Sequence, residues 1–109
     1  MKTYHVWQMK PEYFAELTLA TFGLDVPRVF DESSGKEMYQ INLSQYEKTY
    51  VTSREGGILK NLSQIYHELN QEDRPTGQIS HSLSMGDVIE VENRYYRVGM
   101  MNFEEVSVD

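Results

Sequence analysis

The chain has 109 residues, of which 39% are hydrophobic and 25% charged, values typical of one folded domain rather than a disordered segment. It contains no cysteine, which excludes disulfides and thiolate chemistry. The net charge of -7 argues against direct binding to nucleic acid, because phosphate contacts need lysine and arginine gathered on one face.

The N-terminal region is predicted to be a strand followed by a helix. Residues 3–9 alternate in polarity, with Trp7 on the face opposite Tyr4 and Val6. Pro11 suits the first turn of a helix. The apolar side chains of this helix then fall on one stripe, formed by Tyr13, Phe14, Leu17, Ala20 and Leu24.

Two more strands are expected in the middle of the chain, after a polar loop at residues 31–37. They span residues 38–43 and 46–51, where side chains alternate between two faces. In the second strand Tyr46 and Tyr50 share a face that we expect to be half-exposed. Tyrosine is enriched at interfaces, but β propensity alone also places it in strands, and we favour that structural explanation.

The strongest helical pattern spans residues 58–70, directly after Gly56 and Gly57. Its apolar stripe is formed by Ile58, Leu62, Ile65 and Leu69, and is widened by Leu59 and Tyr66. Residues 71–79 then form a loop that returns the chain to its last strands.

Residues 81–98, HSLSMGDVIEVENRYYRV, are predicted to form a turn followed by a β-hairpin. Residues 84–87 fit a type II turn, with Gly86 at the position that needs a positive φ. Placing Asn93 and Arg94 in a two-residue loop fixes the register of the hairpin. This register gives the hairpin an apolar side, where Ile89 pairs with Val98 and Val91 pairs with Tyr96. On the polar side, Glu90 pairs with Arg97 and Glu92 pairs with Tyr95.

Together with a last short strand at residues 103–108, these elements predict one α+β domain over residues 1–109. We expect a small, mostly antiparallel sheet of four to six strands with two helices on one face. No segment is long and apolar enough to span a bilayer, and residues 1–7 lack the apolar run of a signal peptide, so we expect a cytoplasmic location and no membrane partner.

The hairpin segment also resembles the signature of YodL-like domains, small modules of mobile genetic elements in Gram-positive bacteria. In that family a His-Ser-Leu/Met-Ser segment leads into an apolar strand, a short turn and a tyrosine-rich strand, as residues 81–96 do here. YHVWQM at residues 4–9 resembles the family's opening strand, and LSQIYHELN at residues 62–70 resembles the helix before the signature. The chain departs from the pattern at Ser80, where the family usually has glycine, and in residues 99–103. The resemblance implies the fold, whereas the family has no settled biochemical function.

We predict no catalytic, cofactor or metal site. The three histidines do not stand at a metal-ligand spacing. Ser80, His81 and Ser82 place hydroxyls beside an imidazole, but adjacent residues of an extended chain point to opposite faces, and no acid is fixed nearby to orient the ring. Ser82 or Ser84 is instead expected to bond the backbone of the Gly86 turn. The protein is therefore not expected to be an enzyme.

The resemblance to a mobile-element family favours a non-enzymatic binding protein that counteracts host defence, such as a small anti-CRISPR or antirestriction protein. Its expected partner is a basic host protein, either a CRISPR effector nuclease or a restriction enzyme, because 17 carboxylates against 10 cations suit a basic channel. The candidate contact residues are Asp31, Glu32, Glu37, Tyr46, Tyr50, Glu90, Glu92, Glu104 and Glu105.

The alternative function is an accessory or scaffold module of conjugation or replication machinery, with no inhibitory role. Domains of the resembled family also occur inside large multi-domain proteins, which favours this alternative. Self-association is a further option. The six methionines, which include Met100 and Met101, either form an adaptable patch for a second copy or fill the core, and we favour the core.

Overall fold

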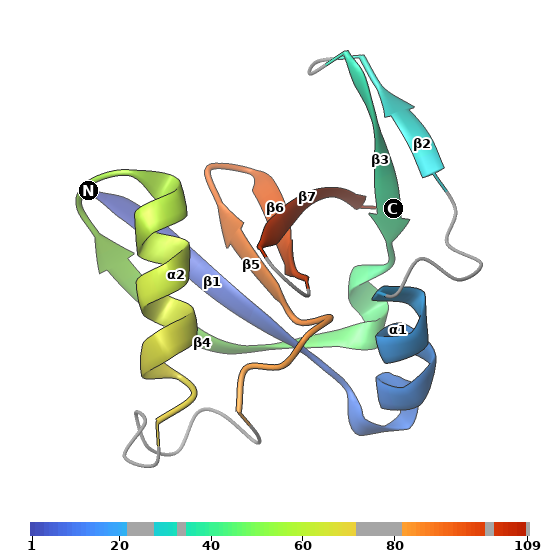
Figure 1. Ribbon diagram of the computed structural model, residues 1–109, viewed down its shortest axis with the longest axis horizontal. Coiled ribbons are helices and arrows are strands. Elements are labelled where there is room, and N and C mark those ends of the chain that lie inside the picture. Colours follow the sequence, from blue (N-terminus) through green and yellow to red (C-terminus); the bar gives the residue numbers. More distant parts are fainter. Residues whose placement is uncertain (22–27, 33–34, 72–81, 100–101, 109) are drawn as a thin grey trace.

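The computed structural model describes residues 1–21, 28–32, 35–71, 82–99 and 102–108 (Figure 1). The strands are β1 (Lys2–Met9), β2 (Arg28–Asp31), β3 (Lys36–Ile41), β4 (Tyr46–Arg54), β5 (Val88–Val91), β6 (Arg94–Val98) and β7 (Phe103–Val108). The helices are α1 (Phe14–Thr21) and α2 (Ile58–Glu68), and the short 3-10 helices are η1 (Pro11–Tyr13) and η2 (Leu43–Gln45). Among the predicted features, Leu24, Ser80, His81, Met100, Met101 and most of the loop at 71–79 lie outside the described residues. Within the described ranges, no helix is long and apolar enough to cross a membrane.

The seven strands form one sheet in the order β2-β3-β7-β6-β5-β1-β4. β3 and β7 run parallel, whereas the other neighbouring strands are antiparallel. The predicted α+β class is confirmed, but the sheet has more strands than the four to six expected and is mixed. The additional strand is β2, which has no predicted counterpart; of the loop expected at residues 31–37, Asp31 belongs to β2 and residues 36–37 belong to β3.

Both faces of the sheet are covered, because β1 carries apolar side chains on both of its faces. Tyr4 and Val6 pack with α2 in one core cluster, and Met9 packs with Leu17 of α1 in a second cluster. The two helices therefore lie on opposite faces, and the expectation that both cover one face is wrong. Besides β1 and its helix, each cluster collects side chains from the C-terminal strands, namely Ile89, Val91, Tyr96 and Val98 in the first and Val88 and Val106 in the second.

Helix α2 is held on its face of the sheet by apolar and polar contacts. Leu62, Ile65 and Leu69 are buried as predicted, whereas Leu59 and Tyr66 are exposed and do not widen the stripe. Two polar contacts join the helix to the strands. Asn61 Nδ2 donates to Tyr4 Oη of β1 at 2.9 Å. The Arg54 guanidinium of β4 donates two hydrogen bonds of 2.6 Å each to the Glu68 carboxylate.

Strand β4 contains a β-bulge that changes which face its side chains occupy. Val6 of β1 pairs with Tyr50, and the next residue, Trp7, pairs with Lys48, so Thr49 has no partner on β1. Residues on the two sides of a bulge are out of phase. Tyr46 therefore packs in the second core cluster, while Tyr50 packs against the first. The predicted half-exposed face shared by Tyr46 and Tyr50 is wrong for this reason.

The hairpin of β5 and β6 closes one residue earlier than predicted. Its loop is formed by Glu92 and Asn93, whose φ angles of 51° and 63° match a type I′ turn. Ile89 consequently pairs with Tyr96 rather than with Val98. The predicted residue pairs are therefore wrong, since each residue of β5 pairs with a residue of β6 two positions earlier than predicted. Side chains alternate with a period of two, so a shift of two residues leaves the apolar side chains on the predicted face.

The other end of the hairpin fixes this register. Gly86 has a φ of 101°, and the amide of Asp87 donates to the carbonyl of Ser84 at 2.9 Å, which confirms the predicted type II turn. The amide of Gly86 donates to the carbonyl of Val98, and the amide of Val98 donates to the carbonyl of Asp87. These bonds hold Val98 beside the turn, so it cannot pair with Ile89.

Candidate functional site

The hairpin of β2 and β3 projects from the rest of the sheet (Figure 1). We call residues 28–32 and 35–41 the β2–β3 arm. Within the arm four residue pairs join the two strands, from Arg28 with Tyr39 to Asp31 with Lys36. Strand β3 joins β7 through only two pairs, Gln40 with Ser107 and Ile41 with Val108. The arm is therefore attached at its base, and its outer part stands clear of β7.

A cavity of about 210 Å³ opens where β3 and β7 separate. If the parallel pairing continued, Glu37 would stand directly beside Glu104 on the same face, and this arrangement of like charges is unfavourable. The strands separate at that position. The Lys36 ammonium lies 3.6 Å from the Glu105 carboxylate and links the two strands. The walls of the cavity are formed by Lys36, Glu37, Met38, Tyr39, Glu104 and Glu105.

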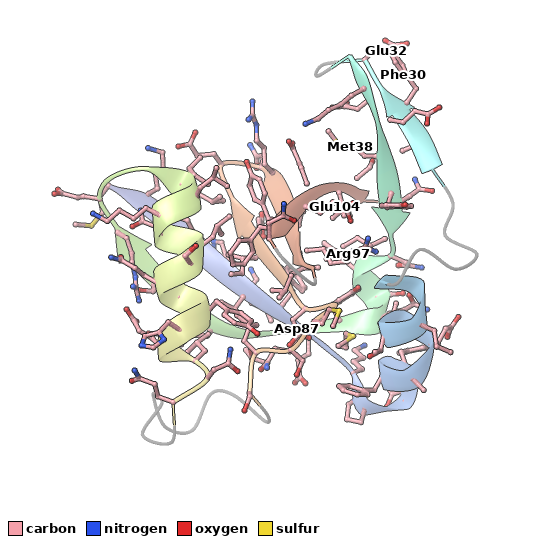
Figure 2. The ribbon with its side chains drawn as sticks, in the orientation of Figure 1. Phe30, Glu32, Met38, Asp87, Arg97 and Glu104 are labelled. Carbon is pink, nitrogen blue, oxygen red and sulfur yellow. The ribbon has the colours of Figure 1, made fainter. Side chains whose placement is uncertain are left out.

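Arg97 of β6 lies beside this cavity and is only 3% exposed (Figure 2). Its guanidinium forms a hydrogen bond and ion pair with Glu104, and it lies over the ring of Tyr39 at 5.0 Å from the ring centre. The Nε atom of Arg97 has no hydrogen-bond partner among the described residues. The predicted pair of Glu90 with Arg97 is wrong, because Arg97 pairs with Val88 in the observed register.

Asp87 anchors the turn that precedes strand β5. It is fully buried, and its two carboxylate oxygens accept hydrogen bonds from the amide of Met9 at 2.9 Å and from the amide of Ser84 at 2.7 Å. The carboxylate therefore joins the Gly86 turn to the end of β1. Ser84 Oγ donates to the carbonyl of Ser82, which lies just before the Gly86 turn rather than within residues 84–87 as we expected.

The two buried charges act on Tyr46. Burial raises the pKa of Tyr46 to about 12, while the positive charge of Arg97 lowers it and the negative charge of Asp87 raises it. The Tyr46 hydroxyl is therefore neutral at every physiological pH.

In an ultraviolet titration we expect Tyr46 to ionise near pH 12, well after an ordinary tyrosine with its pKa of 10.0. Because its pKa is higher in the folded than in the unfolded state, Tyr46 contributes stability that is complete below pH 10 and is lost between pH 10 and about 12. Tyr46→Phe should remove the late-ionising group and flatten the fall of unfolding free energy in that window. An unchanged titration curve in this variant would contradict the assignment.

The structure brings together five of the nine predicted contact residues. Asp31, Glu32 and Glu37 lie on the arm, and Glu104 and Glu105 lie on the facing strand β7. Glu104 pairs with Arg97, and Glu105 pairs with Lys36.

The other four predicted contact residues lie elsewhere. Glu90 accepts a hydrogen bond from Trp7 Nε1 at 3.0 Å, and Glu92 stands in the hairpin loop with its carboxylate 3.5 Å from the Lys2 ammonium. Tyr46 is only 3% exposed, so its side chain is not part of the surface. Tyr50 packs against the first core cluster.

Sequence reasoning missed two residues that organise this region. Asp87 carries a recognisable signal, because an aspartate at the end of a glycine turn commonly accepts bonds from nearby backbone amides. Arg97 gives no such signal, because its burial depends on Tyr39 and Glu104, which lie on other strands. In the part of the chain that the structure describes, no group of three histidine, aspartate or glutamate side chains is placed to hold a metal ion.

The fold and this site define a small α+β domain with helices on both faces of a mixed sheet and a projecting hairpin that faces an acidic cavity. The family model of the YodL-like domain matches residues 3–107, so the chain belongs to the YodL-like domain family. The resemblance of the hairpin segment and of the first strand is thereby confirmed. Searches of curated proteins and of solved structures gave no match.

Proposed function

We propose that this domain is a non-enzymatic acidic binding protein from a mobile element or phage, which counteracts host defence by occluding a basic nucleic-acid-handling enzyme. The partner is a CRISPR effector nuclease or a restriction enzyme. The observation that carries the proposal is the gathering of acidic side chains on the arm and on the facing strand β7. A cytoplasmic location is part of the proposal, because these enzymes act there.

The arm has the shape that a basic channel accepts, and its three carboxylates outnumber its two cations, Arg28 and Lys36. It projects from the sheet, so a partner can surround it (Figure 1). Glu32 and Glu37 are exposed on it, and the whole chain has a net charge of -7. Carboxylates presented in this way compete with phosphates for the same lysine and arginine side chains, and they accelerate encounter with a basic surface at low salt.

The test measures DNA cleavage by a purified guide-loaded CRISPR effector nuclease, and by a purified restriction enzyme, with and without the protein. We expect inhibition of one of them that weakens as the salt concentration rises from about 0.05 to 0.5 M. Neutralising the arm with Asp31→Asn, Glu32→Gln and Glu37→Gln should reduce potency by roughly tenfold or more.

The matched control neutralises three glutamates that are exposed away from the arm, Glu16, Glu47 and Glu55. It removes the same net charge and should leave most of the potency intact. Equal losses in the two triple variants would show that net charge acts without the arm. Inhibition that does not respond to salt would refute the charge-based mechanism. Capture of relaxase or replication proteins, with no inhibition of either enzyme, would favour the accessory-module alternative.

A further inference from the structure

The arm also exposes a large aromatic side chain. Phe30 of β2 is 63% exposed. It pairs in register with Glu37, and the next residue pair along the arm is Val29 with Met38. Figure 2 places Phe30 and Glu32 on the outer part of the arm, away from Arg97 and Asp87.

Phe30 and Met38 of the arm differ in their burial. Successive side chains of a strand point to opposite faces, so Phe30 and Glu37 share one face and Met38 lies on the other. Met38 is only 5% exposed and lines the cavity next to β7. Met38 thus packs against the protein, whereas the phenyl ring of Phe30 is exposed on the opposite face, with the exposed Glu37 as its cross-strand neighbour.

We propose that Phe30 is the apolar anchor of the arm, and that it inserts into an apolar pocket within the basic groove of the partner. This inference rests on the proposed function and identifies the chemistry of the surface that the partner must offer. Charge complementarity supports it, because Glu32 and Glu37 flank the ring and a basic rim around the pocket would pair with them.

A groove that binds nucleic acid has both of these features. Its lysine and arginine side chains hold phosphates, and its apolar or aromatic surfaces stack on bases. The phenyl ring of Phe30 takes the place of a base, and the flanking carboxylates take the place of phosphates. A ring anchored in a pocket and surrounded by polar contacts is also the usual arrangement of residues that dominate binding energy.

The first test replaces Phe30 with the photo-crosslinking residue p-benzoylphenylalanine in bacteria that carry the defence systems, and maps the crosslinked peptides by mass spectrometry. Leu59 of α2 receives the same residue as a control, because it is 66% exposed and lies outside the arm. We expect crosslinks from position 30 to a site lined by lysine or arginine next to apolar side chains, and none to that site from position 59.

The outcomes separate the two proposals. A crosslink into a basic groove of a defence nuclease supports both, and a crosslink into such a groove of another protein supports the anchor but contradicts the proposed function. A crosslink to a second copy of this chain, a crosslink to a surface without cations, or no crosslink from position 30 overturns the anchor.

The second test compares Phe30→Ala with Leu59→Ala in binding to the purified partner that crosslinking identifies. We expect Phe30→Ala to raise the dissociation constant about tenfold or more and Leu59→Ala to leave it within about twofold. Because both side chains are exposed, the melting temperatures of both variants should match that of the natural protein. Equal dissociation constants for the two variants would overturn the anchor.

Discussion

Replacing Asp87 by alanine is expected to lower the free energy of unfolding by about 3 kcal/mol, because it removes the acceptor from one buried and one partly buried backbone amide. These are the amides of Met9 and Ser84, at 2.9 and 2.7 Å from the carboxylate oxygens. Neither amide gains a replacement partner from a methyl group. For a domain of this size the loss corresponds to a melting temperature lower by roughly 10–20 °C.

Urea and thermal denaturation of Asp87→Ala and Asp87→Asn measure this effect. Asparagine keeps one acceptor oxygen and turns a donor toward the other amide, so its loss should be about as large as that of alanine or somewhat smaller. The control is Glu47→Gln on β4, an exposed carboxylate, which should change stability by about 0.5 kcal/mol at most. Asp87 variants as stable as the Glu47 variant would show that the carboxylate does not hold the turn on β1.

The parts of the fold that the sequence predicts correctly are those set by neighbouring residues. The alternation of β1, the stripe of Leu62, Ile65 and Leu69, and the turn at Gly86 each follow from a pattern within one element. Such patterns fix which side chains face the core. They also survive an error in register: the hairpin loop lies one residue earlier than predicted, and Ile89 and Tyr96 still lie on the predicted apolar side.

The parts that sequence reasoning missed depend on contacts between distant segments. The bulge at Thr49 is visible only when β4 is paired with β1. The parallel pairing of β3 with β7 joins Gln40 to Ser107, and no local pattern indicates it. The sequence also does not show that the sheet is apolar on both faces. The two core clusters, one under α2 and one under α1, place the helices on opposite faces.

The candidate site shows the same division. Acidic residues can be chosen from the sequence by type, and five of the nine chosen residues meet around the arm. The sequence does not reveal that Glu104 is used to neutralise Arg97, or that the ring of Phe30 is exposed while Met38 is buried. The sequence shows which residues are acidic, whereas the topology of the fold decides which of them lie close together.

Glu104 gives the second large effect on stability. Glu104→Ala is expected to lower the free energy of unfolding by about 2 kcal/mol, because it leaves the buried guanidinium of Arg97 without its carboxylate. The side chain of Arg97 is only 3% exposed, whereas that of Glu104 is 42% exposed. The cost is therefore asymmetric: an unpaired Arg97 remains buried, but an unpaired Glu104 can turn to water.

The neighbouring Glu105 provides the matched control for denaturation experiments. Its partner Lys36 has a side chain that is 57% exposed, so Glu105→Ala should cost about 0.5 kcal/mol or less. Adding Arg97→Met to Glu104→Ala removes the unpaired charge and should restore part of the stability, since an apolar side chain tolerates burial. Losses of equal size for Glu104 and Glu105, with no recovery in the double variant, would contradict a structural role for the Arg97 pair. With that role established, a binding defect in a Glu104 variant reflects a disturbed arm. A defect in Glu105→Ala that Lys36→Ala does not share reports direct contact of the carboxylate with the partner, because both variants break the ion pair that links the arm to β7.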